Sequence, residues 1–114
     1  MSRGIRSLSH TKHSINSIDW DFFLVSDKVY KAKLGKDSAA LCFFDKKQVY
    51  FCKSEFSIRT IIHELIHCLV ETHNLQSAEL SEDQFEEFMC ELCSNYYYKI
   101  GLWADEIFEK LHKS

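Results

Sequence analysis

The sequence lacks several features that would place it in a special class of protein. It contains no proline and only three glycines in 114 residues, and it has no repeat, low-complexity segment or interior linker. No apolar run approaches the roughly 20 residues that a membrane-spanning helix needs. Residues 1–10 lack the apolar stretch of a signal peptide. We therefore expect a cytoplasmic protein that has no membrane span.

Charge and cysteine content exclude further classes. The formal net charge is only −3 at pH 7, which gives no electrostatic reason to expect nucleic acid as a partner. The five cysteines are an odd number and lack the pattern of a small secreted disulfide framework, so a reducing compartment is favoured. These cysteines are Cys42, Cys52, Cys68, Cys90 and Cys93.

The composition that is present is typical of one globular domain. Hydrophobic residues make up 46% of the chain and aromatic residues 14%, which is too apolar for a disordered protein. The length fits a single core. Residues 1–16 are rich in serine, lysine and histidine. We therefore predict a flexible N-terminal arm over residues 1–16 and a single domain over residues 17–114.

Strand signals occupy the first half of the domain. Residues 18–25 are rich in β-forming side chains, and residues 28–34 favour a short helix or turn. Two further β-rich runs, 39–44 and 48–53, flank a polar turn of hairpin length. The first half therefore predicts a small antiparallel β-sheet.

Helix signals occupy the second half. Ser57 is a favourable N-cap for a helix that reaches about His73, and residues 81–84 form a capping box that opens a second helix. Gly101 is expected to break that second helix, with a short terminal helix after it. The predicted fold class is therefore α+β, in which the sheet packs on the two main helices.

The central feature of the sequence is His63-Glu64-Leu65-Ile66-His67, which places two histidines one helical turn apart. Residues four apart lie on one helix face, and imidazole nitrogen is a preferred zinc ligand. A catalytic zinc keeps one position open for water, beside which Glu64 would act as general base. The stretch matches the HExxH signature of zincins; the plainer alternative is a surface helix whose histidines only face solvent. The apolar residues of the helix collect on its other side: Ile58, Ile61, Ile62, Leu65, Ile66 and Leu69.

Two histidines alone would hold zinc weakly, so a third protein ligand is expected. His73 completes the histidine spacing of metzincin proteases, but Val70 stands where that family has a glycine for a sharp turn. Positive φ is a severe outlier for a β-branched residue, so His73 is the less favoured ligand. A carboxylate on the following helix is favoured, either Glu87 or, as the alternative, Glu86. A downstream helical glutamate resembles the pattern of gluzincins.

The wider chain resembles the small metallopeptidase-like proteins that phages and prophages encode. The segments that carry the resemblance are residues 20–25, 35–40, 65–67 and 86–92. Members of that group look like minimal gluzincins, so the resemblance implies a zincin fold, a Zn²⁺ cofactor and a peptide or protein substrate. It also implies localisation in the host cytoplasm if the chain is phage-encoded.

With this resemblance, the favoured function is a zinc-dependent metallopeptidase-type hydrolase. His63, His67 and Glu87 would hold zinc, and Glu64 would activate water for hydrolysis of an amide bond. The alternative is a non-catalytic, zinc-stabilised binding protein of phage or prophage origin, in which the metal only clamps two helices. Glu64 argues against the clamp, because a closed structural site has no use for a base.

Two further alternatives concern the substrate and a second kind of metal site. The motif fixes the activated water and not the substrate, so a hydrolase that acts on something other than peptides is also open. Cys90 and Cys93 lie three residues apart and, with Cys42 and Cys52, could make a four-cysteine zinc site. Packing of the Cys90 and Cys93 pair in the core is the favoured interpretation, because the two lie within an amphipathic helix.

Overall fold

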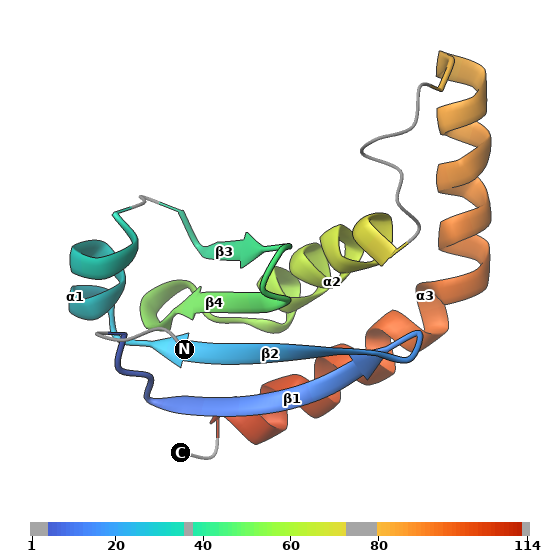
Figure 1. Cartoon of the computed structure of the whole chain (residues 1–114). Coiled ribbons are helices and arrows are strands. Elements are labelled where there is room, and N and C mark those ends of the chain that lie inside the picture. Colours follow the sequence, from blue (N-terminus) through green and yellow to red (C-terminus); the bar gives the residue numbers. More distant parts are fainter. Residues whose placement is uncertain (1–4, 36–37, 73–79, 113–114) are drawn as a thin grey trace.

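A four-stranded sheet with two helices on one face forms the body of the molecule (Figure 1). The computed structural model describes residues 5–35, 38–72 and 80–112. The α+β class that the sequence predicts is confirmed. The strands are β1 (Ser9–Ile15), β2 (Ile18–Val25), β3 (Ala40–Phe43) and β4 (Gln48–Cys52). The helical elements are α1 (Asp27–Val29), η1 (Tyr30–Leu34), η2 (Lys53–Glu55), α2 (Ile58–Thr72) and α3 (Glu82–His112).

The sheet is mixed, which corrects the antiparallel sheet that the sequence predicts. The strand order is β1-β2-β4-β3, so β1 and β3 are its two edges. The β1–β2 and β3–β4 pairs are antiparallel, whereas β2 and β4 are parallel. The parallel pair arises because α1, η1 and β3 all lie between these two strands in the chain, and such a long connection can return the chain to the same end of the sheet.

The flexible arm predicted for residues 1–16 is wrong for Ser9–Ile15, which form the edge strand β1. Ile15 is completely buried in the core. The Ser9 hydroxyl donates a hydrogen bond of 2.7 Å to the backbone carbonyl of Leu111 in α3. The ring of His13 meets Trp103 edge to face, with 5.8 Å between the ring centroids. The strand is therefore held by contacts with residues about a hundred positions away.

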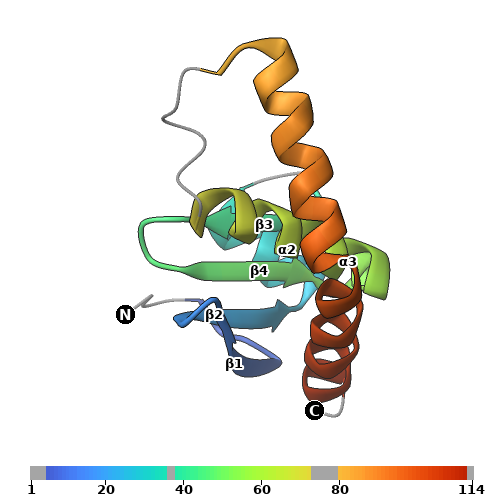
Figure 2. The same ribbon diagram turned by 90° about the vertical axis from the view of Figure 1, so that its right-hand side faces the viewer.

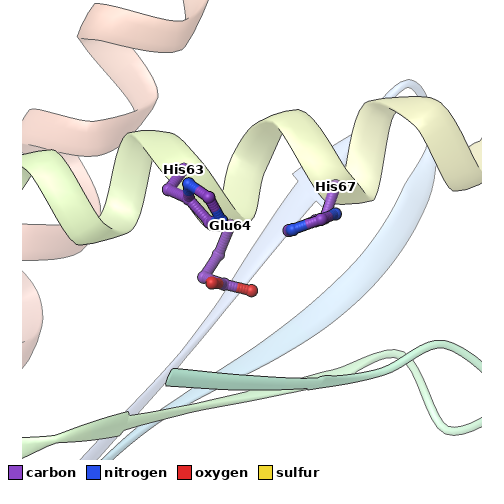
Figure 3. A group of neighbouring side chains, drawn as sticks. All are labelled: His63, Glu64 and His67. Carbon is purple, nitrogen blue, oxygen red and sulfur yellow. The ribbon is translucent and has the colours of Figure 1, made fainter. Parts of the chain in front are cut away.

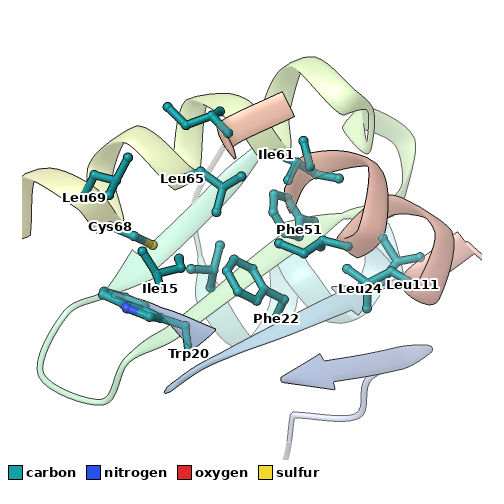
Figure 4. Close-up of a cluster of buried hydrophobic side chains, with 14 of the residues drawn as sticks. Ile15, Trp20, Phe22, Leu24, Phe51, Ile61, Leu65, Cys68, Leu69 and Leu111 are labelled. Atoms are coloured by element: carbon teal, nitrogen blue, oxygen red, sulfur yellow. The ribbon is translucent and has the colours of Figure 1, made fainter. Parts of the chain in front are cut away.

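The core lies between the sheet and the two long helices (Figure 4). The sheet contributes Trp20, Phe22, Leu24, Val49 and Phe51; α2 contributes Ile61, Leu65, Cys68 and Leu69; and α3 contributes Leu92, Ile100, Ala104, Ile107 and Leu111. The buried face of α2 fixes the rotation of this helix about its axis. Its polar face is thereby left to lie alongside the edge strand β3.

Both long helices begin where the sequence predicts. At the start of α2, the Ser57 hydroxyl accepts a hydrogen bond of 3.3 Å from the backbone N–H of Thr60. At the start of α3, the Ser81 N–H donates to the Gln84 side chain at 2.9 Å, and the Gln84 N–H donates back to the Ser81 hydroxyl at 3.2 Å. The capping box predicted for residues 81–84 is therefore confirmed.

The helix α3 continues through Gly101, so the separate terminal helix that the sequence predicts is wrong. A single glycine within a helix costs only about 1 kcal/mol relative to alanine, and the buried residues Ile100 and Ala104 beside it stabilise the helical path. The N-terminal part of α3 extends beyond the rest of the molecule (Figures 1 and 2). Among the described residues, no helix combines the length and the apolar character needed to cross a membrane.

Truncation of Leu65 should test which face of α2 is buried. Leu65 is fully buried, so Leu65→Ala should leave a cavity and lower the free energy of unfolding by about 2–5 kcal/mol. Leu102, on α3, is 51% exposed, and Leu102→Ala should change the free energy of unfolding by no more than about 0.5 kcal/mol. Urea denaturation of both variants measures the difference. A loss of free energy of unfolding in Leu65→Ala as small as that in Leu102→Ala would contradict this orientation of α2.

His13 should make the stability of the fold depend on pH. Burial between β1 and α3 lowers its pKa below 6.5, Glu106 opposes this effect and Lys110 adds to it. Because the unfolded chain binds the proton more readily, the folded state should lose stability as the pH falls through about 6.5 and below.

His13→Gln should remove this part of the pH dependence. The variant should lose less free energy of unfolding than the wild type between about pH 7.5 and about pH 5.5, as measured by urea denaturation at each pH. The same loss in both proteins would show that His13 is not the residue that takes up the proton.

Candidate metal centre

The structure brings the three polar residues of the HExxH stretch together on one face of α2 (Figure 3). His63, Glu64 and His67 each offer one metal-ligand atom, and these atoms all lie within 4.8 Å of one another. The centroids of the two imidazole rings are 4.9 Å apart. Both histidines are exposed, whereas Glu64 is only 7% exposed. The carboxyl group of Glu64 points away from α2 toward the strands beneath the helix (Figure 3).

The geometry of α2 explains this grouping. Arg59, His63, His67 and Glu71 are each four residues apart and form one row along the helix. Leu65 is fully buried on the core side. Because successive residues of a helix are rotated by about 100°, Glu64 falls at the boundary between the row and the core, which is why its carboxyl group is buried beside two exposed imidazoles.

Burial changes the acidity of Glu64. Desolvation raises the pKa of its carboxyl group above the usual value of 4.5, and the two neighbouring imidazoles, His67 and then His63, act in the opposite direction. A carboxylate whose pKa is raised in this way is better suited to take up a proton from water than an ordinary, fully exposed glutamate. This is the property that a general base beside a water molecule requires.

A groove runs between β3 and α2 and past the three residues; we call it the site groove. Its middle hollow, of about 440 Å³, is lined by His63 and Glu64 together with Ser38, Glu55, Ser57, Arg59 and Thr60. A hollow of about 340 Å³ adjoins it toward His67 and is lined by Cys42 and Phe44. The two hollows share Ala40, His63 and Glu64. A third hollow continues past Ser38, Ala39 and Glu55 toward Tyr30.

The turn between β3 and β4 closes the His67 end of the site groove. The ring of Phe44 lies edge to face with His67, with 6.5 Å between the centroids. The Lys47 ammonium donates a hydrogen bond of 2.9 Å to the Phe44 carbonyl and lies 3.8 Å from the carboxylate of Glu71. Lys47 therefore ties the turn to the C-terminal end of α2 and fixes Phe44 opposite the histidine.

The donor set of this group suits zinc. The imidazole nitrogens of His63 and His67 are ligand types that zinc accepts, and the Glu64 carboxylate lies close beside them, where a metal-bound water would need a base. Among the described residues, no other group of three or more histidine, cysteine, aspartate and glutamate side chains comes as close together. The four-cysteine alternative is therefore not formed within the described ranges. Cys90 and Cys93 are exposed, so the prediction that they pack in the core is wrong.

The predicted third ligands lie elsewhere. Glu86 and Glu87 are exposed on the N-terminal part of α3 and do not belong to the group around His63. The helix α3 meets α2 through a different set of residues: Ile62 and Ile66 of α2 line an apolar hollow with Met89, Leu92 and Cys93 of α3. His73 lies outside the described residues. The identity of the third ligand therefore stays a prediction.

Comparison of the chain with protein-family models, with curated proteins and with solved structures finds no match.

Zinc binding should depend on the histidine row. His67→Ala should weaken zinc binding by at least about 100-fold. Loss of a residue that only hydrogen-bonds to a metal ligand already lowers metal affinity by about 10–100-fold, and loss of the ligand itself should lower it more. Glu64→Gln should keep its zinc, because Glu64 is assigned to the water and not to the metal. His112→Ala, which alters an exposed histidine on α3, is the matched control. Competition with a chromophoric chelator measures the affinity. Unchanged affinity in His67→Ala would contradict the assignment.

The same assay separates the candidate third ligands. If Glu87 is a ligand, Glu87→Gln should lose the metal and Glu86→Gln should keep it, and the reverse result would identify Glu86. Full retention of zinc in both single variants and in the double variant would instead favour His73 as the third ligand.

Proposed function

We propose that this protein is a zinc-dependent metallopeptidase-type hydrolase of the minimal gluzincin kind, similar to the metallopeptidase-like proteins of phages and prophages. The observation that carries the proposal is a buried carboxyl group, that of Glu64, within 4.8 Å of the ligand atoms of two exposed imidazoles on the wall of an open groove. A catalytic zinc site leaves one position accessible and needs a base beside it. Both requirements fit this group.

Each residue of the group has a separate role in the proposal. His63 and His67 would hold zinc, with Glu87 as the predicted third ligand. Bound zinc would polarise the scissile carbonyl and lower the pKa of water. The carboxylate of Glu64 would take a proton from the attacking water and later deliver it to the leaving amine. The raised pKa of Glu64 supports both halves of this transfer.

A peptide substrate is supported by the position of β3. This strand is an edge of the sheet, and no described strand pairs with its outer side. An extended peptide can add to such an edge through main-chain hydrogen bonds. The site groove follows this edge past Ala40, which lines it together with His63 and Glu64. A peptide that lay there would carry one of its amide bonds next to the carboxyl group of Glu64.

The structural zinc clamp is supported less well. Such a site closes its shell with four protein ligands. Among the described residues, the group on α2 supplies at most three donor side chains. A closed shell would also leave Glu64 without a role as general base. The group also borders a hollow of about 440 Å³, which leaves room for a substrate.

Loss of the Glu64 carboxylate should remove hydrolysis and leave the metal in place. For zinc-loaded Glu64→Gln, kcat/KM on a mixture of internally quenched peptides should fall by about 10²–10⁴, the usual contribution of a general base. Asp105→Asn, on an exposed position of α3, should match the wild type. Peptide cleavage by Glu64→Gln at the wild-type rate, or no cleavage by the zinc-loaded wild type, would contradict the proposal.

A further inference from the structure

The two ends of the site groove differ in chemistry. On the His67 side the wall is formed by Ala40, Leu41 and Cys42 of β3 and by Phe44 directly after the strand, all of them apolar. Ala40, Cys42 and Phe44 also pack against the core. On the other side of His63 the wall carries, besides Ala39 and Ala40, three hydroxyl groups and two charges. These belong to Ser38, Ser57, Thr60, Glu55 and Arg59. We call these two parts the apolar end and the polar end of the site groove.

The charges of the polar end are available to a bound molecule. Neither Arg59 nor Glu55 forms an ion pair with a described residue, and both side chains are exposed. Arg59 lies one helical turn before His63 on the same face of α2. Because one group is positive and the other negative, this end favours polar side chains in general and does not select one sign of charge.

The direction of β3 sets the direction of a bound peptide. The strand runs from Ala40 to Phe43, from the polar end toward the apolar end. Antiparallel pairing is slightly more stable per residue than parallel pairing, so an added peptide should run from the apolar end to the polar end. The strand β3 has four residues, about 13 Å of extended chain, so its edge can pair with about four residues of substrate.

The scissile bond falls between the two ends, because His63 and Glu64 line both adjoining hollows. We propose that the site groove selects extended peptides with an apolar side chain on the N-terminal side of the scissile bond and a polar side chain on the C-terminal side. Phe44, held by Lys47 opposite His67, is the specificity-determining residue of the apolar end. This inference rests on the proposed peptidase function, but the binding preference can be measured without any hydrolysis.

The test uses two blocked, fluorescently labelled hexapeptides of the same composition. In one, glycine is followed by two leucines, two serines and glycine; in the other, the leucines and serines are exchanged. Binding to zinc-loaded Glu64→Gln is followed by fluorescence anisotropy, so that no peptide is cleaved. The leucine-first peptide should bind about tenfold more tightly, the effect of burying part of a leucine side chain.

Adjacent phenylalanines provide matched variants in the Glu64→Gln background. Phe44→Ala should reduce the ratio of the two peptide affinities to about twofold or less, because the largest side chain of the apolar wall is removed. Phe43→Ala should keep the preference, because Phe43 faces the other side of the sheet and packs against Tyr50. Arg59→Leu changes an exposed residue and should keep its fold. Because the substitution makes the polar end apolar, the peptide whose leucines follow its serines should bind more tightly. The ratio of the two peptide affinities should then fall to about threefold.

The outcomes separate this inference from the proposed function. A tenfold preference in a protein whose zinc-loaded wild type cleaves neither peptide would support the groove specificity and contradict the peptidase. Cleavage of both peptides with equal kcat/KM and equal binding would overturn the specificity and leave the peptidase standing. Tighter binding of the leucine-last peptide, or no binding of either peptide, would also overturn the inference.

Discussion

Burial of one face of α2 against the sheet is the constraint on which the rest of the structure depends. Leu65 and Leu69 are completely buried there, and a helix is stiff enough that two fixed residues determine where every other residue points. His63 and His67 must then face the edge strand β3, and the groove along that strand must pass them. The position of the candidate site is therefore a consequence of core packing and does not depend on contacts among the polar residues themselves.

The same constraint places Glu64 in an unfavourable setting. Its carboxyl group is the one acidic side chain in the described ranges that is buried, and removal of an ionised carboxylate from water costs free energy unless it is well paired. The imidazoles of His63 and His67 offset only part of that cost, as the raised pKa of Glu64 indicates. Perturbed groups of this kind concentrate in functional sites. An arrangement that served stability alone would place glutamine or an apolar residue at this position.

The features that the sequence predicts correctly are those that a few neighbouring residues determine: the strand at Ile18–Val25, the caps at Ser57 and Ser81, and the spacing of the motif. The strand β1 escaped prediction because its partners, β2 and the far end of α3, are selected by tertiary packing. One local signal was present. Asn16 and Ser17 both have positive φ, as in a two-residue hairpin turn, and asparagine is one of the residues that accepts this conformation.

The third ligand shows where spacing ceases to be informative. Counting residues along a sequence finds Glu86 and Glu87 at a suitable interval after His67. The side of α2 on which the next helix packs is decided by other residues, because Ile62 and Ile66 meet Met89 and Leu92 of α3. That interface lies on a different side of α2 from the histidine row. A glutamate of α3 can therefore reach the imidazoles only if the N-terminal part of α3 takes another course over α2. A third donor that approached from the groove side would have to enter beside Cys42 and Phe44, which already line the wall next to His67.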